Sequence, residues 1–364
     1  MSGKKKGFHR IAVWQTAFLG DAVLTLPLIQ SIAAAFPQAG IDLYVRGGLK
    51  DLFAFHPDLD NVFEFRKRGS ERGAKSLLST ASRLSREGYD LFVSPHASIR
   101  SGLLGLLSRI PLRIGYSTPA YNRFFYNQVV SRRFTQLEEI ERILQLLKPL
   151  EIPATSTWPA VHVPPEAEVK AERFFHETRK GPVLGIHPGS VWATKRWPEE
   201  YFARTVREAL DAGVQVLLFA GPGEEEIVSR ILNLSERHHS PGLFTFPANL
   251  TLPEIASFIK RLDCYLTNDS GPMHLAWAQN VPTVAVFGPT VRSLGFFPRG
   301  DTSLVLETDL PCRPCGLHGA EQCPREHHAC MRDITPAMVM AAVFKWLHTD
   351  SGERSLPKGK NKTP

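Results

Sequence analysis

The sequence predicts an α/β protein made of two Rossmann-like domains, each a doubly wound parallel sheet. Short apolar runs alternate with amphipathic helical stretches along the chain, as they do when helices cover both faces of a parallel sheet. A stretch over 151–165 with four prolines interrupts this alternation and is typical of a linker. The length of 364 residues also suits two domains. We expect domains over 8–160 and 166–334, a C-terminal helix over 335–349 and a disordered tail over 350–364.

Each expected strand is a short apolar run, and each expected helix repeats apolar residues at helical spacing. In the first half, strands are predicted at 11–14, 41–45 and 91–93, and helices at 22–36, 77–86, 99–108 and 136–147. In the second half, strands are predicted at 183–187, 214–220, 264–267 and 283–287, and helices at 198–212, 224–236, 253–261, 271–280 and 335–348. Open parallel sheets bind ligands outside the carboxyl ends of their strands. Functional residues are therefore expected at the strand-to-helix junctions, in a cleft that the two domains face.

The net charge of +7 is unevenly distributed along the chain. Residues 1–10 contribute +4 and residues 350–364 contribute +2, which leaves +1 for everything between them. Within that body, 11–150 holds 17 basic and 12 acidic residues, whereas 151–349 holds 18 and 22. A nucleic-acid binder that is basic throughout is therefore disfavoured, and a two-part molecule with one basic half is favoured.

The sequence favours a cytoplasmic protein. No stretch approaches the roughly 20 uninterrupted apolar residues that a transmembrane helix needs. The apolar run after the lysines at 4–6 is broken by Gln15, Thr16 and Asp21, and no small-residue cleavage site follows it, so a signal peptide is rejected. Five cysteines in a chain of this length do not make a secreted disulfide framework.

The first junction carries Gly20 and Asp21 between a strand and a helix. Gly20 permits a tight turn, and Asp21 falls at the start of the helix. One interpretation is a helix cap, because an early Asp satisfies free N–H groups and the helix dipole. The other is a carboxylate base that takes a proton from a nucleophile.

Two junctions of the second half favour a phosphate site. Ser190 follows the strand at 183–187 and precedes Lys195. The Ser190 hydroxyl, nearby N–H groups and the charge of Lys195 suit an anion such as phosphate. The alternative is an ordinary loop with solvated basic side chains. Downstream, Ser270 and Gly271 offer amides to a pyrophosphate at the start of a helix. The alternative there is ordinary capping.

Three further polar side chains lie at these junctions. Asp269 is a candidate to accept hydrogen bonds from sugar hydroxyls, or it is a cap. His274 is a candidate ligand, or a satisfied helical histidine. Glu224 starts a helix after a strand, where a carboxylate either favours the helix dipole or holds a ribose. No G-x-G-x-x-G or Walker sequence is present, so NAD binding and P-loop hydrolysis are not supported.

No Asp or Glu occurs between Asp90 and Glu138, and this span carries six arginines: Arg100, Arg109, Arg113, Arg123, Arg132 and Arg133. A solvated basic face is the ordinary explanation. Arginine also grips phosphate and carboxylate bidentately, so the span suits a polyanionic acceptor.

Four cysteines fall within nineteen residues near the end of the chain: Cys312, Cys315, Cys323 and Cys330. Tetrahedral zinc takes four such ligands, so they are candidates for a structural zinc site. Their spacing matches no common zinc finger, and reduced cysteines that hold a loop by packing are favoured over the metal.

Taken together, the motifs resemble those of the bacterial lipopolysaccharide heptosyltransferases of glycosyltransferase family 9. The resemblance rests on four motifs, GDAVLTLP at 20–27, HPGS-x4-KRWP at 187–198, NDSGPMH at 268–274 and FGPT at 287–290. It runs from about Arg10 to the final helix, and the 312–330 segment is more similar to heptosyltransferase II. Family members usually have Leu where Pro272 stands here. The resemblance implies a GT-B fold, two Rossmann-like domains facing across a cleft.

The resemblance also implies a reaction and roles for the candidate residues. It implies inverting, metal-independent transfer of heptose from ADP-heptose to the lipopolysaccharide inner core on lipid A. Asp21 would be the base that deprotonates the acceptor hydroxyl, and Lys195 would offset charge on the ADP leaving group. The donor would be held by Ser190, Glu224, Asp269, Ser270, Gly271 and His274. The acceptor would be bound by Gly20, Ser98, Arg100 and Arg113.

These expectations leave two alternatives. Another GT-B nucleotide-sugar enzyme would share the fold but prefer a different donor. A non-catalytic protein that binds anionic glycolipid or RNA would use the arginine span, although such a protein needs no carboxylate opposite a phosphate site. We expect ADP-heptose and the lipid A core as partners rather than nucleic acid, and a cytoplasmic enzyme peripheral to the inner membrane, which its terminal lysines and arginines help to hold.

Overall fold

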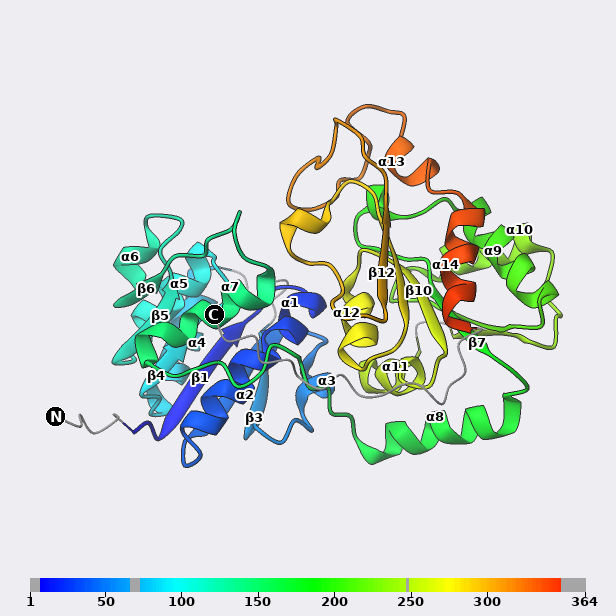
Figure 1. The fold of residues 1–364 in the computed structure, drawn as a ribbon. Coiled ribbons are helices and arrows are strands. Elements are labelled where there is room, and N and C mark those ends of the chain that lie inside the picture. The colour runs from blue at the N-terminus through cyan, green and yellow to red at the C-terminus, as the bar shows by residue number, and fades with distance from the viewer. Residues whose placement is uncertain (1–6, 66–72, 247–248, 348–364) are drawn as a thin grey trace. The chain divides into compact units, whose positions relative to one another are not determined.

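The computed structural model describes residues 7–65, 73–246 and 249–347 of the chain. The chain divides into two compact units (Figure 1). Unit 1 comprises Met1–Glu168 and Ser293–Phe296, and unit 2 comprises Val169–Arg292 and Phe297–Pro364. The lysines at 4–6 and the predicted tail over 350–364 lie outside the described residues.

Unit 1 is built on a parallel six-stranded sheet in the order β3-β2-β1-β4-β5-β6. Its strands are β1 (Arg10–Gln15), β2 (Gly40–Arg46), β3 (Asn61–Phe65), β4 (Leu91–Val93), β5 (Leu112–Tyr116) and β6 (Gln128–Val130). Its helices are α1 (Leu19–Leu24), α2 (Leu26–Ala35), α3 (Lys50–Phe53), α4 (Ala74–Arg86), α5 (Ile99–Leu107), α6 (Asn122–Phe125) and α7 (Glu139–Leu144), followed by the 3-10 helix η2 (Gln145–Leu150). The order is that of a dinucleotide-binding sheet.

The helices of unit 1 cover both faces of its sheet. Ala12 and Trp14 of β1 pack in a cluster with Leu84 of α4 and Leu104 of α5. Because successive side chains of a strand point to opposite faces, the other buried residues of β1 face the far side of the sheet. The helices α1, α2 and α7 pack on one another. The central strands are thus buried on both faces, as in all-parallel sheets.

Two local expectations for unit 1 were wrong. The predicted helix over 22–36 is two helices, because α1 ends at Leu24 and Pro27 lies in the first turn of α2, where a proline starts a helix more readily than it continues one. Gly20 is not at a turn but inside α1, whose first residue is Leu19.

Unit 2 repeats the same sheet with the order β12-β11-β10-β7-β8-β9. Its strands are β7 (Val183–His187), β8 (Gln215–Phe219), β9 (Leu243–Phe246), β10 (Cys264–Asn268), β11 (Thr283–Phe287) and β12 (Ser303–Glu307). Its helices are α9 (Glu199–Asp211), α10 (Glu225–Ser235), α11 (Leu252–Ile259), α12 (Gly271–Ala278), α13 (Ala329–Arg332) and α14 (Pro336–Leu347), with the 3-10 turn η3 (Ala193–Lys195). The 3-10 turn η4 (Arg292–Leu294) begins in unit 2 and continues into the Ser293–Phe296 segment of unit 1. The helix α8 (Pro165–Thr178) spans the boundary between the units.

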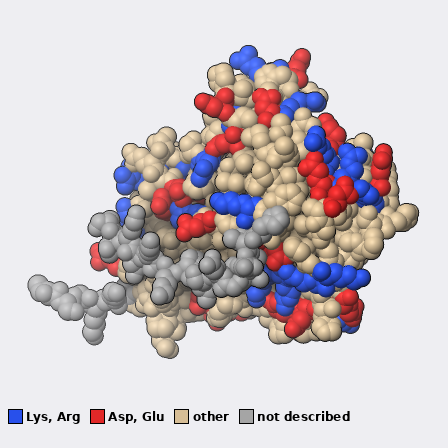
Figure 2. Space-filling view, turned by 45° about the vertical axis from the view of Figure 1, so that its right-hand side comes forward, with Lys and Arg blue, Asp and Glu red and all other residues tan. Residues whose placement is uncertain are grey.

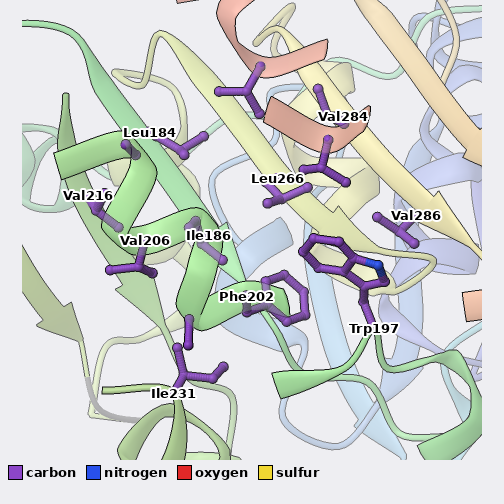
Figure 3. Packing of buried hydrophobic residues seen from close by; sticks show 14 of the residues in the cluster. Leu184, Ile186, Trp197, Phe202, Val206, Val216, Ile231, Leu266, Val284 and Val286 are labelled. Atoms are coloured by element: carbon purple, nitrogen blue, oxygen red, sulfur yellow. The ribbon is translucent and has the colours of Figure 1, made fainter. Parts of the chain in front are cut away.

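The core of unit 2 lies between one face of this sheet and the helices α9, α10 and α14. Figure 3 shows Phe202 and Val206 of α9 directed at Ile186 and Val216 of the strands, with Trp197 beside them. Trp197 is almost fully buried, and its indole N–H donates to the carbonyl of Ile334 at 2.8 Å. This packing anchors the loop between β7 and α9, which carries the predicted phosphate-binding residues.

Both sheets have a switch point, the place where the strand order reverses. It lies between β1 and β4 in unit 1 and between β7 and β10 in unit 2. Loops that leave the carboxyl ends of these strand pairs diverge to opposite faces and leave room for a ligand. Asp21 follows β1, whereas Lys195 and Asp269 follow β7 and β10, so the predicted residues lie at the two switch points.

The surface carries charges of both signs. In Figure 2, lysine and arginine groups alternate with aspartate and glutamate groups over the visible face. Among the described residues, no helix is long and apolar enough to cross a membrane.

Candidate functional site

Asp21 lies in the third position of α1, directly after the first strand of unit 1. Its Oδ2 accepts a hydrogen bond from the backbone N–H of Phe18 at 3.2 Å, so the capping interpretation is correct as far as it goes. The main chain of Asp21 is held as well, because Thr25 donates its hydroxyl to the Asp21 carbonyl at 2.8 Å. Gln15, the last residue of β1, donates to that same hydroxyl oxygen at 3.1 Å. Strand and helix are thereby fixed to each other around the carboxylate.

The pKa of Asp21 is raised to about 6, first by burial and then by the negative charge of Glu139. The hydrogen bond from Phe18 and the positive charge of Arg132 oppose this rise in pKa. A carboxylate with a pKa near 6 is a stronger base than an ordinary aspartate and is still mostly ionised at neutral pH. Capping alone gives no reason for such a shift, which is typical of functional sites.

Glu139 belongs to a buried ion-pair network that sequence reasoning missed. Its two carboxylate oxygens accept hydrogen bonds from Arg132 at 2.7 Å and from Arg142 at 2.9 Å. Arg142 is fully buried and also donates to the carbonyl of Leu294 at 2.8 Å. Arg132 is one of the six arginines in the span without acidic residues, yet it is not without a counter-charge, because Glu139 lies just beyond that span and pairs with it.

The switch point of unit 1 contains a second polar group, at the end of β4. The Nδ1 atom of His96 lies 3.1 Å from the hydroxyl of Thr16 and 3.0 Å from the hydroxyl of Ser101. Ser98 caps α5 by accepting from the N–H of Ser101 at 3.2 Å. Sequence reasoning assigned Ser98 but passed over His96, although it stands at the end of a buried strand beside Ser98.

The two arginines assigned to the acceptor hold parts of unit 1. Arg113 donates to the carbonyls of Ile110 at 2.6 Å and Phe125 at 3.0 Å, and partial burial lowers its pKa. Arg100 lies over the ring of Phe65, 4.9 Å from the centroid. These contacts give both arginines a structural role, and their contact with an acceptor stays a prediction.

In unit 2, the structure brings Lys195 and Asp269 together from loops 74 residues apart in sequence. The ammonium of Lys195 donates to Oδ2 of Asp269 at 2.5 Å, and both side chains are about nine-tenths buried. The same oxygen accepts the hydroxyl of Thr290 at 2.6 Å. The sequence pointed to Thr290 only as the last residue of the FGPT motif at 287–290, and its contact with Asp269 is a finding of the structure.

Glu224 is held against the loop that carries Ser190. Its Oε2 lies 2.8 Å from Nε2 of His187 and accepts the N–H of Gly221 at 2.8 Å. Burial raises the pKa of Glu224, but the contact with His187 and the N–H of Gly221 outweigh burial, so the pKa is lowered overall. Gly189 lies so close that a Cβ there would overlap the Glu224 carboxylate. The glycine is therefore required for this approach.

Asn268 joins the two loops at the switch point of unit 2. Its amide donates to the carbonyl of Pro188 at 2.7 Å, and its oxygen accepts the N–H of Trp197 at 3.0 Å. It is fully buried at the end of β10. Asn268 thus fixes the ends of β7 and β10 relative to each other, which places Ser190 on one side and Asp269 on the other.

The helix α12 begins at Gly271, with Ser270 as its N-cap residue. The first amides of a helix have no acceptor within it and suit an anion. His274 is buried one turn later, and burial lowers its pKa to about 4, so it is neutral. Its Nδ1 accepts the indole N–H of Trp277 at 3.1 Å, which leaves the proton on Nε2.

The cysteine segment gives no support to a zinc site. The thiols of Cys312, Cys323 and Cys330 are free, and burial raises the pKa of Cys330 to about 11. Across residues 7–65, 73–246 and 249–347, no group of three or more His, Cys, Asp or Glu side chains is placed to hold a metal ion. The segment packs on the loop that carries Lys195, because Thr194 N–H donates to the carbonyl of Ala320 at 3.0 Å.

Comparisons with known proteins identify the family and the fold of the chain. Residues 77–319 match the model of glycosyltransferase family 9 (heptosyltransferase). The chain is 24% identical over 339 residues to lipooligosaccharide heptosyltransferase 2 of Campylobacter jejuni, covering 92% of this chain and 98% of that protein.

Two solved structures share the fold. One is a family 9 glycosyltransferase from Veillonella parvula, with a TM-score of 0.82, 22% identity and coverage of 95% of this chain and 99% of that one. The other is ADP-heptose lps heptosyltransferase II of E. coli, with a TM-score of 0.76, 23% identity and coverage of 93% and 98%. The GT-B expectation is confirmed. The chain belongs to glycosyltransferase family 9, the heptosyltransferase family, and is a glycosyltransferase.

Proposed function

We propose that this enzyme transfers heptose from ADP-heptose to the inner core of lipopolysaccharide on lipid A. The observation that carries the donor half is the set of groups gathered at one switch point. A buried lysine, a buried aspartate and the start of α12 meet there, with Glu224 close to the same loop. This set suits a nucleoside diphosphate sugar. The lysine and the backbone amides would bind the diphosphate, and the carboxylates would accept hydrogen bonds from the sugar hydroxyls.

In this proposal Lys195 and the amides of Ser270 and Gly271 bind the diphosphate. Negative charge grows on the leaving ADP as the bond to the sugar breaks, and a cation with prearranged N–H donors stabilises that charge. These groups suffice without a divalent metal, so we expect full activity in the presence of a chelator. Glu224 holds the ribose, and Asp269 accepts from the heptose hydroxyls.

On the acceptor side we assign the general base to Asp21. The acceptor hydroxyl attacks the anomeric carbon as ADP leaves, and its proton passes to the Asp21 carboxylate. A single displacement of this kind inverts the configuration of the anomeric carbon. The raised pKa of Asp21, about 6, supports the role, because a base is most effective when its pKa lies near the working pH.

The acceptor is expected on unit 1, with Gly20, Ser98, Arg100 and Arg113 as contacts. Phosphorylated lipid A core is anionic, and residues 11–150 hold 17 basic against 12 acidic residues, whereas residues 151–349 have an acidic excess. We place the enzyme in the cytoplasm, peripheral to the inner membrane, where its basic termini are attracted to anionic lipid.

The direct test is incubation of the purified protein with ADP-heptose and heptose-deficient lipid A core, followed by mass spectrometry. A gain of one heptose in the acceptor supports the proposal. A matched assay with UDP-sugars tests the identity of the donor. Transfer from a UDP-sugar but not from ADP-heptose would show that the transferred sugar is not heptose. Tight, salt-sensitive RNA binding without ADP-sugar binding would favour the non-catalytic alternative.

A further inference from the structure

The turn formed by Phe287–Thr290 begins at the last residue of β11. All four of its backbone carbonyl oxygens accept hydrogen bonds from Arg313 or Cys315 of the 312–330 segment. The guanidinium of Arg313 donates to the carbonyls of Phe287 at 3.1 Å and Thr290 at 2.7 Å, and also to that of Gly288. The remaining carbonyl, of Pro289, accepts the N–H of Cys315 at 2.9 Å. Such complete capture of a turn fixes its conformation.

Arg313 is itself held on its other side. It donates to Oε2 of Glu307 at 3.0 Å and to the carbonyl of Thr308, and only 4% of its side chain is exposed. An arginine presents five N–H donors in a rigid plane and can bind several carbonyls at once. A lysine at this position has a single ammonium and cannot reach the same set of acceptors.

The turn carries Thr290, which reaches the donor-site pair. The Thr290 hydroxyl donates to Oδ2 of Asp269 at 2.6 Å, and the same oxygen accepts Lys195 at 2.5 Å. Thr290 is 2% exposed, so water has little access to replace this contact. The orientation of the Asp269 carboxylate therefore depends on the conformation of the turn.

The same segment also contacts the loop that carries Lys195. Thr194 and Ala320 bond reciprocally, with the Thr194 hydroxyl 2.8 Å from both the carbonyl and the N–H of Ala320. His328 Nε2 lies 2.7 Å from the carbonyl of Thr194. A Cβ at Gly319 would meet Lys195 and its neighbours. The segment thus touches both sides of the Lys195–Asp269 pair.

We propose that Arg313 is a positioning residue for donor binding, acting through the Phe287–Thr290 turn and the Thr290 hydroxyl on the Lys195–Asp269 pair. The inference rests on the proposed function for the identity of the donor. It does not place Arg313 in contact with substrate. It gives the cysteine segment a task in this enzyme that involves no metal.

The test compares Arg313→Lys, Thr290→Val and the double variant, with Arg325→Ala as the matched control. Arg325 is an exposed arginine on the same segment, so its removal changes the charge without touching the turn. We expect each single variant to bind ADP about tenfold more weakly in calorimetry, the loss typical of one hydrogen bond to a charged group. The donor KM should rise while the acceptor KM stays unchanged, and Arg325→Ala should match the wild type.

The double variant separates positioning from general support of the fold. If Arg313 acts through Thr290, the double variant binds ADP no more weakly than the Thr290→Val protein. Additive losses would show that Arg313 acts by another route and would overturn the inference. Should Arg313→Lys fail to fold, Glu307→Gln is the second variant, because it weakens the ion pair that holds the guanidinium of Arg313. ADP affinity equal to that of the wild type in Glu307→Gln would also contradict the inference.

A final measurement needs no nucleotide. The rate at which an amine-acylating reagent labels Lys195, followed by mass spectrometry, reports how firmly the lysine is held. It should increase several-fold in Arg313→Lys and Thr290→Val and stay unchanged in Arg325→Ala. Wild-type labelling rates in both variants would overturn the positioning role. A wild-type protein that binds no ADP would instead refute the proposed function, with the labelling result still deciding on Arg313.

Discussion

The ammonium of Lys195 lies 2.5 Å from Oδ2 of Asp269, with only 11% and 10% of the two side chains exposed. A buried charge pair is costly to form and is weak evidence for stability. Here it keeps a positive charge in place at the switch point of unit 2, next to the start of α12. In the proposed function, a bound diphosphate offers this lysine a second anionic partner.

Replacing Lys195 by Met should therefore weaken ADP binding about 10- to 100-fold, as expected for the loss of hydrogen bonds between charged groups. Isothermal calorimetry measures the effect. Lys180→Met removes an exposed lysine from the same unit and serves as control, with unchanged affinity expected. Equal affinity of the Lys195→Met protein and the wild type would exclude the lysine from the diphosphate site.

The base assignment predicts a pH dependence of the rate. The pKa of Asp21 is raised to about 6, and only its ionised form accepts a proton. The turnover number should rise with pH through about 6 and then level off. The terminal phosphate of ADP also titrates at about pH 6, so the control is that ADP affinity depends on pH in the same way in the wild type and in Asp21→Asn. In Asp21→Asn the turnover should fall at every pH with ADP binding retained. If the turnover number instead rises with pH near 3.8, the ordinary pKa of an aspartate, the Asp21 carboxylate is not desolvated during the reaction.

The same pKa predicts a gain in stability when the base is removed. In the unfolded chain Asp21 ionises near 3.8, and in the folded protein near 6, so the folded state holds the proton more tightly. Stability is therefore lost as pH rises from about 4 to 6, on the order of 1–3 kcal/mol for a shift of this size. Asp21→Asn should raise the melting temperature at pH 7.5 but not at pH 4. A variant that is less stable than the wild type at pH 7.5 would contradict the shift.

The sequence predicted the central strands and the junctions, and it missed strands at the sheet edges. The strands β3, β6, β9 and β12 are the edges of the two sheets in the described part of the chain, and each is partly exposed. Strands that are buried on both faces are continuous apolar runs, whereas edge strands mix polar and apolar residues and give a weaker signal. The fifth missed strand, β5, carries Arg113 and Gly115 within its five residues.

The candidate site was predicted residue by residue but not as a network. Asp21, Lys195 and Asp269 follow strands, so their place at the carboxyl edge could be inferred from local pattern alone. The contacts of Glu139 with Arg132 and of Thr290 with Asp269 arise from chain packing, which no local spacing encodes. Burial is the first cause of the raised pKa of Asp21, and Glu139 adds to the rise while Arg132 opposes it. Thr290 holds the carboxylate of Asp269.

The last prediction concerns Gly189, whose Cα lies against the Glu224 carboxylate. An added methyl group would overlap that carboxylate, which is held by His187 and Gly221 and cannot move without losing both contacts. Gly189→Ala should therefore cost about 1–3 kcal/mol of stability, as expected for overpacking a well-packed position. It should also weaken ADP binding, because Glu224 is displaced from the position in which we propose that it holds the ribose. Gly181→Ala is the matched control, since its Cβ would meet only the carbonyl of Gly213 at an ordinary 3.5 Å. Thermal unfolding with and without ADP measures both effects. If the Gly189→Ala protein has the melting temperature of the wild type and the same rise in melting temperature on adding ADP, Glu224 can move aside and is not a fixed part of the donor site.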